Sequence, residues 1–427
     1  KEVFNHYYKK GWIYQGDKVV NWCVKDATSL SDLELEYQEE KGKLWHVKYP
    51  IKEGSFITVA TTRPETMLGD AAVAVNPKDK RYEKLVGKTA ILPIIDREIP
   101  IIADDSVEKE FGTGAVKVTP AHDFADAEIG ERHNLPKYQI INEKGKMTEI
   151  AGKEFMGLKI EEAREKVVAK IKELGLLEKE EDYLHSVARC YRCNTAIEPL
   201  ISKQWFLKMD KLAKPAIDAI ESGKIKYYPE RWKDISLDWL KNIKDWCISR
   251  QIWWGHKIPI EGSNDVLDTW FSSALWPFAI LGWPSSVKTA EGKPESTGDL
   301  KIFYPTSFIT SARDILHLWI SRMIFSGLEF TGDVPFHNAL IHGTILAKDG
   351  KRMSKSLGTG IDPLELIQKY GADATRFGLV WQSMGGQDIH WTEEHVLAGK
   401  KFINKLWNIT RFILLKTEKS FDDNEPK

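Results

Sequence analysis

The feature that most constrains the fold is a change in hydrophobic periodicity along the chain. Beyond residue 200, amphipathic helical patterns alternate with short buried-strand patterns, as in residues 269–279, 314–325 and 339–346. This alternation is typical of a parallel sheet covered by helices. From about residue 45 the pattern is instead one of short β-branched or apolar runs between turn residues. We therefore predict an α/β protein whose parallel sheet is split by a β-rich insertion.

Two kinds of element are expected inside the insertion. Residues 56–60, 91–95 and 99–102 are short apolar or β-branched runs, which predict strands. A helix is predicted from Ile160 to Leu174, with Gly175 as its stop. Its apolar residues recur three or four apart, at Ile160, Ala163, Val167, Ile171 and Leu174.

Composition indicates a large enzyme but identifies none. Of the 427 residues, 42% are hydrophobic, which is enough for several cores. The net charge is -1, so any contact with RNA must use local basic patches. No apolar run approaches the length of a membrane span, and four cysteines do not make a disulfide framework. We expect a cytoplasmic monomer that does not contact a membrane.

A basic loop at residues 351–358 narrows the chemistry furthest. Lys355 lies between the hydroxyls of Ser354 and Ser356, with glycines on either side of the loop. An ammonium on a long stem can follow the charge that builds on a leaving pyrophosphate. The motif alone also fits a solvated Lys/Ser turn, so both readings stay open at this point.

The loop precedes a well-marked helix. Asp362 is the predicted N-cap, Pro363 occupies the first helical position and Glu365 completes a capping box. Gly371 follows Tyr370 as the stop. The loop should therefore be anchored to a defined helix.

A second group of polar residues lies within the insertion. Strand alternation places Lys117 and Thr119 on one face, and Asp123 and Asp126 follow after a proline. Two carboxylates, an ammonium and a hydroxyl suit a ligand that carries an α-ammonium and a side-chain hydroxyl. The alternative is an ordinary surface ion-pair cluster.

Three cysteines and an aspartate are spaced like metal ligands. Cys190-x-x-Cys193 follows the insertion and Cys23-x-x-Asp26 precedes it, so the four residues should meet where the chain enters and leaves. A Cys3Asp set could hold a structural Zn²⁺ ion, more weakly than four thiolates would. Whether the four residues bind zinc or no metal is left open at this point. Cys247 has no such spacing and is expected to be a buried packing residue.

Several motifs together resemble the class I aminoacyl-tRNA synthetases. Residues 352–356 resemble that family's basic pentapeptide, with Arg352 in place of a lysine, and residues 340–343 and 370–374 also match. The resemblance implies ATP with Mg²⁺ as substrate. It implies catalytic roles for Lys355, Ser354 and Ser356, ATP contacts from His342, Gly343, Arg352, Met353 and Lys355, and an amino-acid pocket walled by Trp270 and Ile315.

Residues 61–66 and 117–123 narrow the resemblance to the valine-specific branch of that family. It implies activation of valine, transfer to the valine tRNA, and hydrolysis of threonine mistakenly attached to that tRNA. Asp126 would meet the α-ammonium, and Lys117, Thr119 and Asp123 the threonine hydroxyl. The hydrolytic pocket would be lined by Thr61, Thr62, Arg63, Phe111, Lys117, Thr119, Asp123 and Asp126.

The resemblance also implies a division of the chain. The nucleotide-binding, Rossmann-like domain would comprise residues 1–40 and 190–345, with the editing domain at 41–189 between them. The basic loop and a tRNA stem-contact region would follow at 346–394, and a helical anticodon-binding domain would begin at 395–427. Residues 246–256 would face the tRNA acceptor end or form aromatic core.

One departure limits the expected activity. The family's His-x-Gly-His element, whose imidazoles stabilise the same phosphates, is missing from the sequence. We therefore expect a fragment of a longer enzyme, one that deacylates threonyl-tRNA weakly but forms no aminoacyl-adenylate. The alternatives are an isoleucyl-type enzyme and a non-catalytic RNA-binding derivative.

Overall fold

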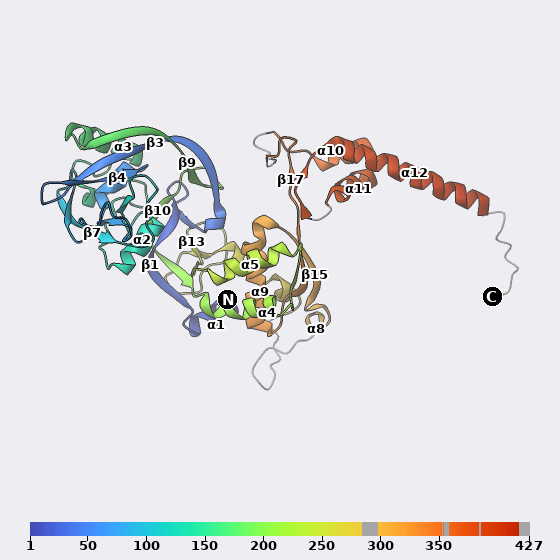
Figure 1. Ribbon diagram of the computed structural model, residues 1–427. Helices are drawn as coiled ribbons and strands as arrows, with labels where there is room; N and C mark the ends of the chain where they lie inside the picture. The colour runs from blue at the N-terminus through green and yellow to red at the C-terminus, as the bar shows by residue number, and fades with distance from the viewer. Residues whose placement is uncertain (284–297, 352, 354–357, 384–385, 418–427) are drawn as a thin grey trace. The chain divides into compact units, whose positions relative to one another are not determined.

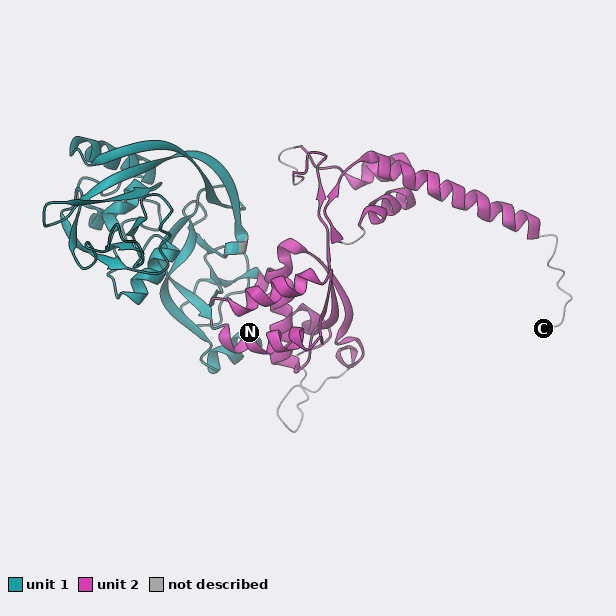
Figure 2. Cartoon of the chain, in the orientation of Figure 1, with its two compact units in different colours: residues 1–208, 245–269 teal, residues 209–244, 270–427 magenta. Residues whose placement is uncertain are grey.

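The computed structural model describes residues 1–283, 298–351, 353, 358–383 and 386–417. It divides into two compact units (Figure 2). Unit 1 comprises Lys1–Lys208 and Asp245–Thr269, and unit 2 comprises Met209–Lys244 and Trp270–Lys427. Among the described residues, none of the helices is both long and apolar enough for a membrane span.

Unit 1 begins with a four-stranded antiparallel sheet in the order β12-β10-β1-β2. Two of these strands, β1 and β10, are labelled in Figure 1. Ten consecutive residue pairs join β1 to β10, from Ile13↔Leu207 to Trp22↔Glu198. The chain then passes into the insertion along β3 and returns along β9, which pair antiparallel from Leu35↔Cys190 to Val47↔Leu177. These long strands hold the two chain crossings together.

The insertion carries a second sheet, in the order β6-β7-β5-β8. Its core is formed by apolar side chains of β3 to β7 and of α3, which packs near the 3₁₀ helix η2. The elements of unit 1 are α1 (Glu2–Lys9), β1 (Ile13–Cys23), β2 (Thr28–Leu30), η1 (Asp32–Glu34), β3 (Leu35–Pro50), β4 (Phe56–Thr61), η2 (Pro64–Gly69), β5 (Ala72–Val75), β6 (Thr89–Leu92), β7 (Arg97–Ala103), β8 (Ala115–Val118), α2 (Phe124–Arg132), η3 (Glu149–Ala151), α3 (Ile160–Glu173), β9 (Leu177–Cys190), β10 (Glu198–Leu207), β12 (Trp246–Cys247), β13 (Ser249–Arg250) and β14 (Val266–Leu267).

The predicted helix of the insertion is confirmed as α3, and its inner face is the predicted one. Ile160, Ala163, Val167 and Ile171 are buried. Leu174 was predicted to belong to that face, but it is the C-cap and is 52% exposed. Gly175 follows with a positive φ of 66°, which a glycine adopts without strain.

One predicted strand is shorter than expected. The sequence predicts a strand over residues 91–95, but β6 ends at Leu92 and Pro93 begins a turn. In that turn Ile94 and Asp96 have positive φ values of 71° and 57°. Proline has no N–H for a strand partner, so pairing ends there.

Unit 2 contains the predicted parallel sheet, three-stranded in the order β11-β16-β15. The helical stretch predicted at 269–279 is divided into α6 and α7, because Pro277 and the preceding turn interrupt it. The elements are α4 (Asp210–Glu221), β11 (Lys226–Tyr228), α5 (Arg231–Lys241), α6 (Thr269–Ser273), α7 (Trp276–Ala279), α8 (Asp299–Phe303), β15 (Thr306–Ala312), η4 (Arg313–Ile315), the π-helix η5 (Leu316–Ile320), α9 (Ser321–Thr331), β16 (Phe336–His342), β17 (Ile345–Leu346), α10 (Pro363–Tyr370), α11 (Ala372–Gln382), β18 (Ile389–His390) and α12 (Glu393–Thr417).

The helix predicted after the basic loop is α10. Asp362 caps it by accepting a hydrogen bond from Leu364 N at 2.8 Å, and Gly371 ends it with a φ of 91°. The parallel sheet, the β-rich insertion and the helical C-terminal part agree with the predicted fold class. The division of the chain into five segments stays a prediction, and the two compact units divide the chain at other residues.

Candidate functional site

Lys117 in the insertion contacts two polar side chains, those of Thr119 and Asp70. Its Nζ lies 2.5 Å from Thr119 Oγ1 and 3.4 Å from Asp70 Oδ1. Asp70 precedes β5, and the antiparallel register Ala72↔Val118 brings it beside the end of β8. Lys117 is 9% exposed, Thr119 1% and Asp70 0%, so this is a buried cluster and not a surface ion-pair cluster.

Asp70 was not predicted from the sequence. Its Oδ1 accepts a hydrogen bond from Thr119 Oγ1 at 2.6 Å, and its Oδ2 accepts one from Tyr49 OH at 2.7 Å. Burial raises the pKa of the Asp70 carboxyl, while Lys117 and the two hydroxyls oppose that rise. A polar residue between Gly69 and the apolar run at residues 71–75 was the only sequence signal.

Asp123 and Asp126 have different surroundings at the start of α2. The exposed Asp123 caps the helix, accepting from Ala125 N at 2.8 Å and Asp126 N at 3.0 Å. Asp126 is 7% exposed and accepts from Thr119 N at 2.8 Å. Burial raises the pKa of Asp126 to about 7, with Lys117 opposing and Asp123 assisting. Its carboxyl can therefore change charge near neutral pH.

Arg63 belongs to a neighbouring charge network. Its guanidinium pairs with Glu198, and its Nε lies 3.1 Å from Glu65 Oε1. Glu65 is fully buried and also receives two hydrogen bonds from Arg164, at 2.8 and 2.9 Å. Burial would raise the pKa of Glu65, but Arg164 and Arg63 outweigh it and lower that pKa. Arg63 thus joins η2 to β10, a role the sequence did not reveal.

The other predicted pocket residues lie nearby in the chain but differ in exposure. Thr61 is buried, and its Oγ1 accepts a hydrogen bond from Arg63 N at 3.0 Å. Thr62 is half-buried, and Phe111 is 50% exposed. Whether Thr62 and Phe111 line the same pocket as Lys117 stays a prediction.

His122 lies within the same motif but is not free to act as a base. Its Nε2 faces two backbone donors, Ile140 N at 3.0 Å and Ile141 N at 3.3 Å. Nε2 must therefore accept, and the ring proton resides on Nδ1, 3.1 Å from Pro199 O. Burial, followed by the charge of Arg63, lowers the pKa of His122 to about 3. The neutral ring ties the insertion to β10.

The four predicted metal ligands lie together. Their ligand atoms, from Cys23, Asp26, Cys190 and Cys193, are all within 4.8 Å of one another. Cys23 Sγ is 3.4 Å from Cys193 Sγ, and Cys190 Sγ is 3.4 Å from Asp26 Oδ2. Four ligands about 2.3 Å from a tetrahedral ion lie about 3.8 Å apart, so the set fits a zinc ion with small adjustments.

The residues predicted to meet ATP are only partly within the described chain. Arg352, Ser354, Lys355 and Ser356 lie outside the described residues. His342 is exposed at the carboxyl end of β16, and Met353 is half-buried. A Cβ on Gly343 would lie 1.9 Å from Gln387 O, so the glycine is required by this backbone contact. The predicted ATP contact of Gly343 stays a prediction.

Trp270 and Ile315, the predicted pocket walls, are both half-buried in unit 2. Trp270 lies in α6 and Ile315 in η4, directly before the π-helix. A shared amino-acid pocket stays a prediction. In the segment at 246–256, Trp246 is buried, whereas Trp253 and Trp254 are 92% and 74% exposed. Contact of this segment with the tRNA acceptor end stays a prediction.

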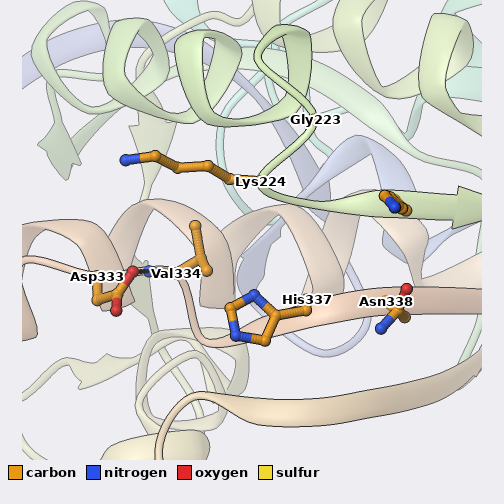
Figure 3. Close-up of a pocket in the computed structure, with 7 residues that line it drawn as sticks. Gly223, Lys224, Asp333, Val334, His337 and Asn338 are labelled. Carbon is orange, nitrogen blue, oxygen red and sulfur yellow. Dashed lines mark hydrogen bonds between the residues drawn. The ribbon is translucent and has the colours of Figure 1, made fainter.

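A cavity of about 460 Å³ lies at the amino ends of β11 and β16 (Figure 3). Lys224, Lys226 and His337 line it together with Asp333. The helices α4 and α9 both end close by, at Glu221 and Thr331. Because helix C-termini attract cations, the two lysines are explained as local charge compensation. Nucleotide sites of parallel sheets lie at the opposite, carboxyl edge.

Comparison with known proteins gives consistent matches. A family model described as tRNA synthetases class I (I, L, M and V) matches residues 1–263 and 260–392. A valine--tRNA ligase of Carboxydothermus hydrogenoformans is 50% identical over 98% of this chain and 50% of its own length. One from Thermotoga maritima is also 50% identical, with the same coverage. The chain thus spans about half the length of the curated relatives it matches.

Solved structures give more distant matches. Methionyl-tRNA synthetase of Mycobacterium tuberculosis, in complex with methionyl-adenylate, is 19% identical with a TM-score of 0.46. It covers 55% of this chain and 45% of its own. The family match and the sequence identities therefore carry the comparison.

Proposed function

The chain belongs to the class I tRNA synthetases of the isoleucyl, leucyl, methionyl and valyl group, and on that basis we propose that it functions as a valine--tRNA ligase with editing activity. The observation that carries the proposal is about 50% identity to valine--tRNA ligases along nearly the whole chain. These relatives favour valine over the isoleucyl alternative. The proposed partners are valine, ATP with Mg²⁺ and the valine tRNA, and a cytoplasmic monomer stays the expectation.

In the proposed synthetic reaction, the valine carboxylate attacks the α-phosphate of ATP and pyrophosphate leaves. The resulting adenylate then esterifies a ribose hydroxyl of the tRNA and releases AMP. Lys355 would stabilise charge on the pyrophosphate, with Ser354, Ser356 and Arg352 as further donors. His342, Gly343 and Met353 would contact ATP, while Trp270 and Ile315 would enclose the isopropyl group.

The proposed editing reaction hydrolyses threonyl-tRNA. Water adds to the ester carbonyl, the bond to the ribose oxygen breaks, and threonine and tRNA are released. Asp126 would hold the α-ammonium when ionised, and Lys117 and Thr119 would hold the side-chain hydroxyl, with Asp123 fixing the start of α2. The buried arrangement of these groups supports the proposal, because a pocket built for a hydroxyl rejects a methyl in its place.

We also propose that Cys23, Asp26, Cys190 and Cys193 hold a structural Zn²⁺ ion. A bound ion would crosslink β1 to the end of β9, at the base of the insertion. Metal analysis of the purified chain should find one zinc per molecule, and a Cys190→Ser variant should lose it and melt at a lower temperature. Retention of zinc by that variant would contradict the assignment.

The editing proposal is tested by incubating the 427-residue chain with a valine tRNA carrying threonine. We expect release of threonine above the spontaneous rate, and much slower release of valine. A chain that binds this tRNA but releases neither amino acid would instead support the non-catalytic RNA-binding alternative.

A further inference from the structure

His122 lies in the turn that separates the two halves of the polar group around Lys117. The turn begins at Thr119, whose carbonyl accepts from His122 N at 3.0 Å, and it ends at Asp123, the N-cap of α2. Lys117 and Thr119 precede the ring, and Asp126 follows it in the first turn of α2. The side chain of His122 is buried, with 2% of its surface exposed. The path of this turn therefore sets how far Asp126 lies from Lys117.

Both ring nitrogens of His122 are bonded to the backbone of other segments. Nε2 accepts from Ile140 N at 3.0 Å and from Ile141 N at 3.3 Å, both within the insertion. Nδ1 donates to Pro199 O at 3.1 Å, in β10, which lies outside the insertion. A neutral imidazole has one donor and one acceptor, so neither nitrogen is left for a substrate. Any role of His122 in the reaction must therefore act through geometry.

The strand that accepts from His122 is bonded to the insertion at two places. Alternate residues of a strand direct their carbonyls to the same side, so the carbonyls of Pro199 and Ile201 face the same way. Ile201 O accepts from Gln139 Nε2 at 3.1 Å, and Pro199 has no N–H to leave unpaired. In the described chain β12 pairs with β10 only at Phe206 and Leu207. Side chains of the insertion thus bond to β10 where β12 does not reach.

The turn matters because the proposed substrate would be held from both sides of it. Asp126 would bind the α-ammonium of threonine, while Lys117 and Thr119 would bind its side-chain hydroxyl. These two substrate groups are on neighbouring carbons, so the protein groups must match a fixed spacing. The bond from Thr119 N to the Asp126 carboxylate, at 2.8 Å, also spans the turn. A misplacement of about 1 Å can reduce a rate about 100-fold.

We propose that His122 is a positioning residue of the editing reaction, because its bond to Pro199 O holds the turn at the spacing that a threonyl group requires. This inference rests on the proposed editing function and adds a residue to it. It also means that a strand outside the insertion sets part of the geometry of the editing site.

Two substitutions separate the two sets of bonds that the ring makes. In His122→Asn, the amide nitrogen replaces Nδ1 and can donate to Pro199 O, but nothing accepts from Ile140 N and Ile141 N. In His122→Gln, the amide oxygen can reach the place of Nε2 and accept from these two groups, but the donor to Pro199 O is lost. If the bond to β10 positions the turn, His122→Gln should impair editing and His122→Asn should not.

Stability should change in the opposite order. His122→Asn leaves two buried N–H groups without an acceptor, whereas His122→Gln leaves one carbonyl without a donor. The asparagine variant should therefore be the less stable of the two and the more active. A purely structural role would make the less stable variant the less active one.

Gln139→Leu is the matched control. It removes the other bond between the insertion and β10, at Ile201 O, and leaves the bonds of His122 in place. A general loosening of the insertion from β10 should appear in this variant as well. An effect on the turn should be confined to His122→Gln.

The test measures release of threonine from a valine tRNA carrying threonine, using the full chain and the three variants. For His122→Gln we expect the rate at saturating tRNA to fall about tenfold or more, and for His122→Asn and Gln139→Leu to stay within about threefold of the wild type. Urea unfolding should give a lower midpoint for His122→Asn than for His122→Gln. Equal losses of rate in the two histidine variants, or a retained rate in His122→Gln, would overturn the proposal.

The urea measurement also establishes that each variant is folded before its rates are compared. If His122→Gln does not fold, His122→Leu replaces it, since leucine cannot donate to Pro199 O, and the same tenfold loss is expected. A retained rate in His122→Leu would contradict the inference. A wild-type chain without threonine release would refute the editing function itself, which is a separate outcome.

Discussion

The group around Lys117 and the residues expected to meet ATP differ in how they are held. In the insertion, Lys117, Thr119, Asp70 and Asp126 are buried and bonded to one another. His342 is exposed at the carboxyl end of β16, and in the basic loop the side chain of Lys351 is 84% exposed. The first site is held by the protein's own hydrogen bonds, so its geometry is formed without a ligand. The second presents exposed groups that a polyanion would have to organise.

The largest expected effect comes from removing the ammonium at the centre of the buried group. Lys117→Met should abolish measurable release of threonine, because the donor to the substrate hydroxyl is lost. It also leaves Asp70 buried without its positive partner, which should cost about 3 kcal/mol of stability. Urea unfolding and threonyl-tRNA deacylation measure the two effects. Lys43→Met, which removes an exposed pair with Asp182, serves as the control and should change neither.

The second expected effect is a pH dependence centred on Asp126. Its pKa is raised to about 7 in the folded chain, so the folded state holds a proton that the unfolded state releases near pH 4. Stability should therefore fall as pH rises from about 4 to about 7. Threonine release should rise across pH 7, because the ionised carboxylate binds the α-ammonium. Asp126→Asn should remove both pH steps, and a wild-type profile that is flat across pH 7 would contradict the assignment.

A smaller effect tests the other region. Gly343→Ala places a Cβ against the carbonyl of Gln387, so the backbone there must shift, and we expect a loss of about 2 kcal/mol. His342→Ala removes an exposed side chain next to it and should change stability by less than about 0.5 kcal/mol. Urea unfolding measures the stability of both variants. Similar losses of stability would show that His342 is packed as tightly as Gly343, which would contradict the contrast.

Sequence periodicity predicted the elements whose burial follows a regular repeat. The helix at Ile160 and the parallel sheet are examples, since a three-to-four spacing and a helix-strand alternation define them locally. Strand ends were less predictable: Pro93 stops β6 within an apolar run.

The polar partners within the site were only partly predictable. Lys117, Thr119 and Asp126 lie close together in sequence and carry a visible pattern. Asp70 and Tyr49 reach the same cluster through strand pairing across long stretches of chain, which no local pattern records. The pocket role of Arg63 stays a prediction. Its pairs with Glu65 and Glu198, the latter 135 residues away, follow from no local sequence pattern.

The central proposal is that the insertion holds an editing site for threonine around Lys117, Thr119 and Asp126. The most direct test assays the 427 residues for threonyl-tRNA deacylation and for valine-dependent exchange of pyrophosphate into ATP, in parallel. The editing proposal predicts measurable release of threonine from threonyl-tRNA, above the spontaneous rate. Valine-dependent exchange in the absence of threonine release would contradict it.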